Sequence, residues 1–379
     1  MLFRSTNIKS PHISKEDLVY ITEEHASTLQ RSRLNKGDIV FAKTGATIGK
    51  CGMNNIIDYG ILSSSCVKIA ISEKYNNRYF YYLFYTDQFN RSLKDACVGT
   101  TRDTINLIPF SNLKVCVPKT EEQARIADFL DKKVSEIDAV ISKTKESIEE
   151  YKKLKQSIIT QTVTKGLDPN VEMKDSGIEW IGKIPSTWNI NTVFQLFVQV
   201  KNKNSELLEN NLLSLSYGKI KKKSIETTEG LLPESFDGYN IINRNDIVLR
   251  LTDLQNDHKS LRVGIAEEKG IITSAYLTLK NRSLSIPKYL YYYLHSFDIA
   301  KGFYGMGAGV RQGLTWDGIK WLKILTPPHD EQVQIVNYLD KQCYKYEELI
   351  SKKELFITEL EQYKKSLIYE YVTGKKEVA

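Results

Sequence analysis

The chain has 379 residues, of which 41% are hydrophobic and 26% are charged, and this balance predicts a globular, soluble protein of about two domains. No apolar run approaches the roughly 18–20 residues that span a bilayer, and the N-terminus lacks a signal-peptide core, so we expect no membrane association. Lys and Arg exceed Asp and Glu by 53 − 46 = 7, which mildly favours a polyanionic partner.

The five cysteines are scattered and never spaced CxxC. This pattern argues against a zinc site and against a disulfide framework, and it fits a reducing, cytoplasmic compartment.

Residues 1–118 predict a mixed α/β domain rich in strands. The expected elements are an apolar strand at 39–42, a glycine-containing loop at 44–49, a strand at 66–71, a buried aromatic helix at 79–85, a loop at 99–102 and a last strand at 113–117. Pro118 and the candidate N-cap Thr120 then announce a helix.

Residues 119–166 predict one long helix, because residues 121–164 contain no Gly or Pro and their apolar positions recur in steps of four and three. About 44 residues at 1.5 Å each would extend roughly 65 Å. Residues 328–379 repeat this helix with an offset of 209, since 16 of 44 aligned positions are identical. The predicted seam residues are Leu130, Ile137, Ile141, Ile148, Leu339, Ile350, Ile357 and Leu360.

Neither helix can bury its apolar stripe alone, so we expect the two helices to pair as an antiparallel coiled coil. Residues 167–327 predict a linker and a second domain that repeats the element order of the first. The fold class is therefore α+β, with two mixed α/β domains alternating with two long helices. The second domain opens with DSGIEWIGKIPSTW at 175–188, which has no counterpart in the first half. Either the chain starts inside its first domain, or the missing strand comes from elsewhere. We expect the first domain to be incomplete, or truncated, at its N-terminus.

This layout resembles the specificity subunit of type I restriction–modification enzymes. The resemblance rests on the tandem domain–helix order, the opening at 175–188, the segment KGDIVFAKTGATIGK at 36–50, and the Pro-x-x-x-Glu-Gln helix starts at 118–123 and 327–332. It implies two target-recognition domains that each read half of a bipartite, asymmetric sequence in double-stranded DNA. It also implies long helices that set the spacing and dock two methyltransferase subunits, with restriction and motor subunits joining the full complex.

The residues expected to contact DNA share polar loops that follow strands: Lys43, Thr44, Lys50 and Arg102 in the first domain, and Arg250, Arg311 and Gln312 in the second. Arg pairs bidentately with guanine and Gln with adenine. Arg250 is placed at the strand end where Lys43 would stand. A solvated turn explains the loop at 45–50 as well as a DNA contact does, and a salt bridge to the long helix explains Arg102 and Arg311.

Other patterns predict little chemistry. Residues 45–50 lack the spacing and the Ser or Thr of a phosphate-binding loop, and the tyrosine clusters at 79–85 and 289–293 fit core packing better than base stacking. His258 near Asp253 and Asp257 is a weak metal candidate. The basic run at 219–223 could supply phosphate contacts.

We find no methyltransferase or nuclease constellation, so we expect a non-catalytic subunit without cofactor or metal. The alternative is a coiled-coil scaffold that joins two protein-binding modules without touching DNA.

Overall fold

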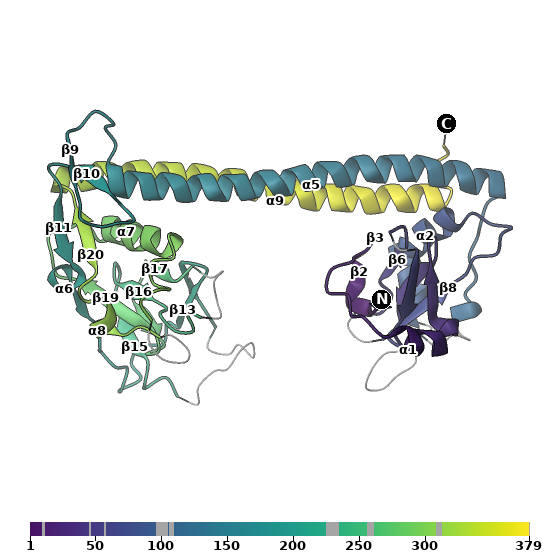
Figure 1. The fold of residues 1–379 in the computed structure, drawn as a ribbon, viewed down its shortest axis with the longest axis horizontal. Helices are drawn as coiled ribbons and strands as arrows, with labels where there is room; N and C mark the ends of the chain where they lie inside the picture. Colours follow the sequence, from purple (N-terminus) through teal and green to yellow (C-terminus); the bar gives the residue numbers. More distant parts are fainter. Residues whose placement is uncertain are drawn as a thin grey trace. The chain divides into compact units, whose positions relative to one another are not determined.

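The computed structural model describes residues 1–9, 12–44, 47–56, 58–95, 105, 110–224, 235–255, 261–307 and 313–378. The chain forms two compact units (Figure 1). Unit 1 contains Met1–Glu146 and Lys353–Ala379, and unit 2 contains Ser147–Lys352. Each unit therefore combines one domain with part of both long helices. Among the described helices, none is both long and apolar enough to cross a membrane.

The domain of unit 1 is built on a five-stranded sheet of order β2-β3-β6-β5-β8 and a three-stranded sheet of order β1-β7-β4. Its strands are β1 (Leu2–Phe3), β2 (Ile8–Lys9), β3 (His12–Ile13), β4 (Arg33–Asn35), β5 (Ile39–Ala42), β6 (Cys51–Met53), β7 (Tyr59–Leu62) and β8 (Cys66–Ile69). Its helices are η1 (Ser5–Asn7), α1 (Glu23–Thr28), η2 (Gln30–Ser32), α2 (Asn77–Tyr85) and α3 (Asp87–Asp95), followed by the long α5 (Thr120–Lys165).

The domain of unit 2 is built on a four-stranded sheet of order β12-β19-β16-β17 and several two-stranded pairs. Its strands are β9 (Met173–Asp175), β10 (Lys183–Pro185), β11 (Asn189–Thr192), β12 (Phe197–Gln199), β13 (Leu213–Ser216), β14 (Lys219–Lys222), β15 (Asn240–Ile242), β16 (Ile247–Leu249), β17 (Val263–Ile265), β18 (Gly270–Ile272), β19 (Leu277–Asn281) and β20 (Lys323–Thr326). Its helices are α6 (Val193–Leu196), α7 (Pro287–Ile299) and α8 (Trp316–Ile319), followed by the long α9 (His329–Val372).

Aromatic helices form the centre of both cores. Every residue of α2 from Tyr79 to Phe84 is buried, and the ring of Phe41 on β5 lies edge-on to that of Phe84 at 5.4 Å. In unit 2, Tyr289 and Tyr293 of α7 are fully buried. These tyrosines are core residues, as their helical spacing predicted, and they are not available for base stacking.

The same polar contacts join each domain to its long helix. The hydroxyl of Tyr82 on α2 donates to Asp131 Oδ1 of α5 at 2.7 Å, and Tyr292 on α7 donates to Asp340 Oδ1 of α9 at 2.7 Å. Because Asp131 and Asp340 are identical positions of the repeat, the junction of domain and helix is repeated together with the sequence.

A glutamine in the first turn of each long helix makes a second repeated contact. Gln123 Oε1 accepts the backbone N–H of Asn76 at 2.9 Å, and Gln332 Oε1 accepts that of Ile286 at 2.9 Å. Both glutamines are buried, so each fixes the start of its domain's aromatic helix against the start of the long helix. Thr120, the expected cap, is instead the first residue of α5, and its hydroxyl donates to the carbonyl of Lys74 at 3.0 Å.

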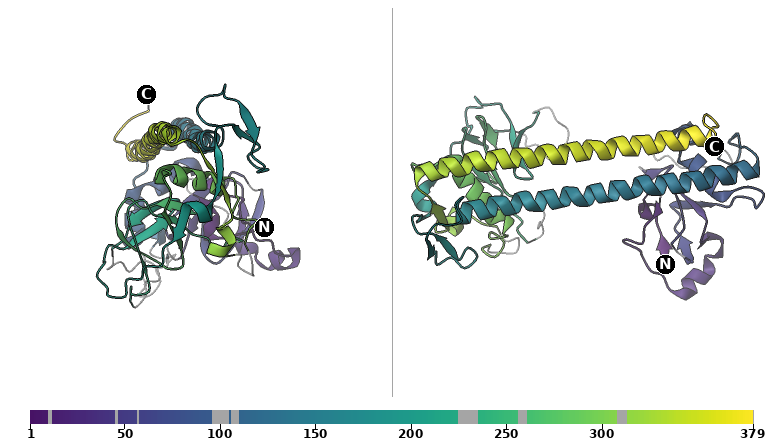
Figure 2. Two further views of the ribbon diagram at one scale, coloured as in Figure 1. Left: turned by 90° about the vertical axis from the view of Figure 1, so that its left-hand side faces the viewer. Right: turned by 90° about the horizontal axis from the view of Figure 1, so that it is seen from above.

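In unit 1, the first part of α5 and the last part of α9 lie side by side and run antiparallel (Figure 2). The rings of Phe129 and Tyr371 are 4.4 Å apart, and Lys364 Nζ lies 2.5 Å from Asp138 Oδ1. From Phe129 to Asp138 the chain advances along α5, whereas their partners run backwards along α9 from Tyr371 to Lys364. The helices are therefore antiparallel.

In unit 2, the last part of α5 pairs with the first part of α9 in the same way. The rings of Tyr151 and Tyr346 are 6.1 Å apart, and Lys155 Nζ lies 2.9 Å from Glu347 Oε1. Lys155 and Glu347 are the repeat equivalents of Lys364 and Asp138, because 155 + 209 = 364 and 138 + 209 = 347. Lys155 and Lys364 therefore form matched ion pairs between the helices, which favours one register.

The predicted seam residues differ in their burial. Leu130, Ile137, Ile141, Ile148 and Leu339 are buried, whereas Ile350, Ile357 and Leu360 are half-buried.

One expected strand is absent from unit 1. Residues 113–117 were predicted to form the last strand of the first domain, but they adopt no strand conformation. Their repeat equivalent in unit 2 is β20, which pairs antiparallel with β11. Among the described residues of unit 1, no strand pairs with residues 113–117. A strand is stabilised by hydrogen bonds to a neighbouring strand. Without such a pair, residues 113–117 do not form the predicted strand.

Candidate nucleic-acid interface

The candidate site in unit 1 is the loop that joins β5 to β6. The backbone of Ala42 donates to the carbonyl of Lys50 at 2.9 Å, and Gly49 donates to the carbonyl of Ala42 at 3.2 Å, which closes the base of this loop. Gly49 has φ +80°, a conformation that favours glycine. Above this base, Lys43 and Thr44 are half-buried and Lys50 is exposed. Gly45 and Ala46 lie outside the described residues.

The equivalent loop in unit 2 joins β16 to β17. Its base is closed by the backbone of Arg250, which donates to the carbonyl of Arg262 at 2.9 Å. This hydrogen bond matches the one from Ala42 to Lys50, so Arg250 is equivalent to Ala42 rather than to Lys43. The expected equivalence of Arg250 and Lys43 is therefore wrong by one residue. The backbone hydrogen bonds between the two strands of each hairpin set the equivalence, and the sequence does not show them. The two loops occupy the same place but differ in length, spanning 43–49 and 251–261.

Arg262 was not identified from the sequence, although it organises this loop. Its side chain is fully buried, and its Nη1 donates to the carbonyls of Arg250 at 3.1 Å and Thr252 at 2.8 Å. Its Nη2 donates to the carbonyl of Asp253 at 3.3 Å, and its Nε donates to the hydroxyl of Tyr304 at 3.2 Å. A buried guanidinium with these partners holds the backbone of residues 250–253 in one conformation.

The same guanidinium lies 5.1 Å from the centroid of the Tyr304 ring, and the backbone N–H of Arg262 donates to Asp298 Oδ2 at 2.6 Å. Arg262 and Lys50 are equivalent, since each offers its carbonyl to close its loop. In the sequence, the one indication of a role for Arg262 is that it directly precedes the strand at 263–265, as Lys50 directly precedes the strand at 51–53.

Three candidates, Arg102, Arg311 and Gln312, lie outside the described residues, as do Asp257 and His258 of the metal hypothesis. Their described neighbours nevertheless show where two of these segments attach. The backbone of Ile105 donates to the carbonyl of Lys43 at 2.9 Å, and that of Leu314 donates to the carbonyl of Leu251 at 2.8 Å. In both domains, the chain that carries the candidate arginine is thus hydrogen-bonded to the candidate hairpin loop.

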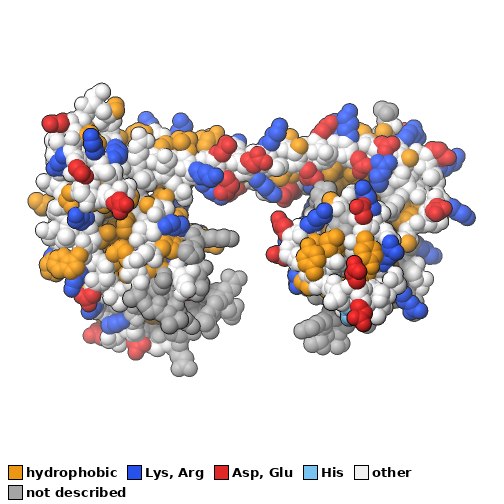
Figure 3. All heavy atoms as spheres, in the orientation of Figure 1, with side chains coloured by type: hydrophobic (Ala, Val, Ile, Leu, Met, Phe, Trp, Pro, Cys, Tyr) orange, Lys and Arg blue, Asp and Glu red, His pale blue; other side chains and the backbone are white. Residues whose placement is uncertain are grey.

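The basic run at 219–223 lies on β14 and just beyond it. Lys219 Nζ is 2.8 Å from Glu347 Oε2, which ties this hairpin to α9. Burial alone would raise the pKa of Glu347, but hydrogen bonds from Lys219 and Lys155 hold this pKa below its usual range. Lys221, Lys222 and Lys223 are exposed. On the face drawn in Figure 3, Lys and Arg are interspersed with Asp and Glu in both units, so charge alone marks no DNA-binding surface there.

Comparison with known proteins identifies what these hairpins belong to. Residues 5–150 match the family model for the type I restriction modification DNA specificity domain. The specificity subunit of the type I restriction enzyme MjaVIII from Methanocaldococcus jannaschii is 28% identical over 360 residues, covering 90% of this chain and 80% of that protein. The chain belongs to the specificity subunits of type I restriction–modification systems.

Solved structures share the fold of this specificity subunit. A chain from a study of complex assembly and conformational transition of the type I restriction–modification system has a TM-score of 0.65 at 15% identity, covering 90% of this chain and 82% of that one. The HsdS subunit from Thermoanaerobacter tengcongensis has a TM-score of 0.50 at 16% identity, covering 99% of this chain and 90% of that one.

The specificity subunit is not itself catalytic. It is the DNA specificity component of a type I complex. The alternative hypothesis, a coiled-coil scaffold that does not contact DNA, is therefore excluded. Within the described residues, no group of three or more His, Cys, Asp and Glu side chains is placed to hold a metal ion.

Proposed function

We propose that each domain reads one half of a bipartite DNA target through its hairpin loop and the segment bonded to that loop. The observation that carries this proposal is the repeated framework around unequal loops. Both hairpins are closed by the same backbone hydrogen bond, and both accept the same cross-bond from the following segment. The loops themselves differ in length and in every candidate side chain. A framework kept twice around divergent loops fits two readers of different sequences.

The proposed DNA contacts are Lys43, Thr44 and Lys50 in the first domain and Arg250 in the second. Exposed ammonium groups suit phosphates, whereas guanidinium and hydroxyl groups suit base edges. Arg102, Arg311 and Gln312 are proposed as further contacts, because their segments are attached to the same hairpins. Counterion release should make binding fall steeply with rising salt.

We further propose that the paired helices dock two methyltransferase subunits and determine the spacer between the half-sites. The support is that each unit contains parts of both helices, paired by matched ion bridges. Inserting one heptad in both helices, at positions equivalent by the 209 offset, should lengthen the recognised spacer without changing either half-site.

The decisive test is half-site selection. The methyltransferase complex is assembled with Arg250→Ala or with Lys50→Ala, and the methylated sites are mapped by sequencing. Arg250→Ala should relax or weaken only the half-site read by unit 2, and Lys50→Ala only the other half-site. Arg244→Ala is the matched control, because Arg244 is exposed and precedes β16 whereas Arg250 follows it. If both half-sites change together, or neither changes, the assignment of one reader to each unit is wrong.

A further inference from the structure

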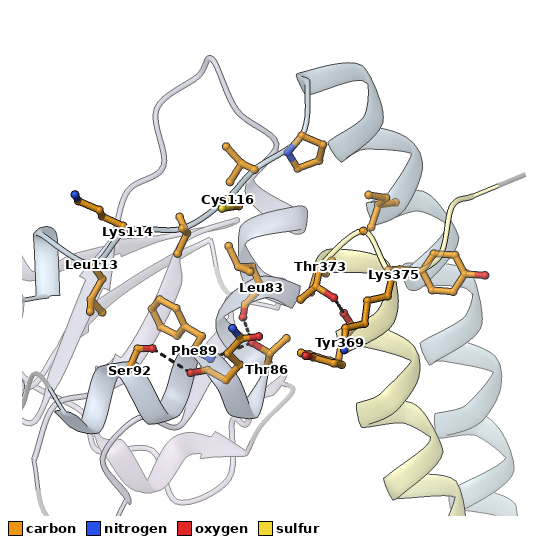
Figure 4. Close-up of a pocket in the computed structure, with 18 of the residues that line it drawn as sticks. Leu83, Thr86, Phe89, Ser92, Leu113, Lys114, Cys116, Tyr369, Thr373 and Lys375 are labelled. Carbon is orange, nitrogen blue, oxygen red and sulfur yellow. Dashed lines mark hydrogen bonds between the residues drawn. The ribbon is translucent and has the colours of Figure 1, made fainter.

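Unit 1 contains an open groove beside the segment that failed to form a strand. The groove has a volume of about 620 Å³ and lies between residues 113–118, α3 and the C-terminal end of α9. Figure 4 shows Lys114 and Cys116 on one side and Phe89 of α3 below. Tyr369 of α9 and Thr373, which follows this helix, lie on the other side. All of these residues belong to unit 1.

The repeat shows what occupies the same place in unit 2. There β11 pairs antiparallel with β20, in the register Ile190 opposite Leu325. As a result Ile324 of β20 is fully buried, whereas its equivalent Val115 is 38% exposed (115 + 209 = 324). Val117, equivalent to Thr326, is likewise 36% exposed. The groove of unit 1 is therefore the site that β11 covers in unit 2.

A tryptophan anchors the covering segment of unit 2. Trp188 is fully buried, and its indole Nε1 donates to Glu331 Oε2 at 2.9 Å. Ile184 on β10 is also fully buried in the same core cluster. Glu331 is identical to Glu122 in the repeat, and Glu122 lines the groove of unit 1. The acceptor for an indole N–H is thus present in unit 1, on the wall of an open groove.

The backbone beside the groove is also arranged differently. In unit 2, the hydroxyl of Tyr289 donates to the carbonyl of Leu325 on β20 at 3.0 Å. In unit 1, the equivalent Tyr79 donates to the carbonyl of Val372 at the end of α9, at 2.8 Å. In the described part of unit 1, residues 113–117 belong to no sheet. Their backbone groups are the pairing edge that a further strand requires.

We propose that this groove binds an extended polypeptide segment with the chemistry of residues 184–192, an aliphatic residue and a proline, then a tryptophan, then a short strand. The strand pairs with residues 113–117, the tryptophan enters the groove and donates to Glu122, and the aliphatic residue packs against the apolar wall. Strand addition supplies backbone hydrogen bonds, while the tryptophan pocket supplies selectivity. Bound in this way, the segment covers residues 113–117 and Glu122 as residues 184–192 cover β20 and Glu331 in unit 2.

The test uses the full chain and a fluorescently labelled synthetic peptide of residues 182–194, added in trans. We expect saturable binding by anisotropy, and slower hydrogen exchange at amides 114–117 when the peptide is bound. A peptide carrying Trp188→Ala should bind at least about tenfold more weakly, because it loses both the buried ring and its hydrogen bond.

Protein variants locate the binding. Val117→Asp, at an exposed position, and Glu122→Ala should each weaken binding at least about tenfold, whereas Glu136→Ala on an exposed face of α5 should not. Circular dichroism establishes that the variants are folded. Unchanged exchange at amides 114–117, or equal affinity for the two peptides, would overturn the proposal. Concentration-dependent dimerisation that protects the same amides without peptide would overturn the occupant, and would assign the groove to a second copy of the chain.

Discussion

Arg262→Met tests whether one buried side chain positions the candidate loop of unit 2. The substitution keeps a long, flexible apolar stem and removes the guanidinium, which has no exposed surface. Three backbone carbonyls, those of Arg250, Thr252 and Asp253, lose their donor. The hydroxyl of Tyr304 loses a donor as well.

The magnitude follows from these contacts. A hydrogen bond to a charged group contributes about 1.5–3 kcal/mol, and several such bonds are lost together. Removing the guanidinium also removes the free-energy cost of burying a charged group. The net loss of stability is therefore smaller than the sum of the lost hydrogen bonds. Removing one member of a buried charged network typically costs about 3–5 kcal/mol, and we expect Arg262→Met to lower the free energy of unfolding by this amount.

The assay is urea unfolding followed by tryptophan fluorescence, together with DNA selection by the assembled complex. Arg244→Met is the matched control, and because Arg244 is exposed its cost should stay within about 0.5 kcal/mol. Arg262→Lys, which retains the charge but not the planar fork, should be intermediate. In DNA selection, Arg262→Met should relax the unit 2 half-site while the other half-site is unchanged. A cost below about 1 kcal/mol, with unchanged selection, would refute the idea that Arg262 organises the loop.

Three further outcomes follow from contacts within single units. Lys364→Glu should destabilise unit 1 by about 2 kcal/mol, because Lys364 is 7% exposed and faces Asp138; adding Asp138→Lys should restore most of this in a double-mutant cycle, and additive effects would contradict the pairing. Trp188→Ala should cost about 3–5 kcal/mol in urea unfolding, since a fully buried, hydrogen-bonded ring is lost; a cost near that of a surface change would contradict this role. Burial and the nearby Lys155 lower the pKa of His295 from 6.5 to about 4, so the unfolded chain takes up a proton at a higher pH than the folded chain does. Stability should therefore fall by about 2 kcal/mol between pH 7 and pH 5, and this part of the pH dependence should be missing from His295→Phe.

Much of the fold could be read from the sequence because its signals are local or repeated. The step of four and three between apolar residues predicts a helix wherever the helix packs, and the 209-residue offset relates both helices without any coordinates. The aromatic runs at α2 and α7 predict buried helices for the same reason. The family resemblance came from the order of these features and was confirmed by comparison.

The failures share a different cause. Residues 113–117 have the composition of a strand, but a strand requires a paired neighbour. The described part of unit 1 holds no strand that pairs with them as β11 pairs with β20 in unit 2. The expected equivalence of Arg250 and Lys43 is wrong because the register of a hairpin depends on hydrogen bonds between its strands, which the sequence does not show. Arg262 looks like any surface arginine until its carbonyl acceptors are brought together by the loop.

The sequence by itself therefore determined the two helices, the repeated domains and the family, because periodicity and internal repetition are properties of the chain. Only the tertiary structure decided which lysines pair across the helices, which arginine is buried beneath a loop, and which domain retains an open groove. Each of these depends on contacts that form only when the chain is folded: Lys364 with Asp138, Arg262 with the carbonyl of Thr252, and Trp188 with Glu331. Glu122 and Glu331 occupy the same place in the Pro-x-x-x-Glu-Gln pattern, but no strand covers Glu122 in the described part of unit 1.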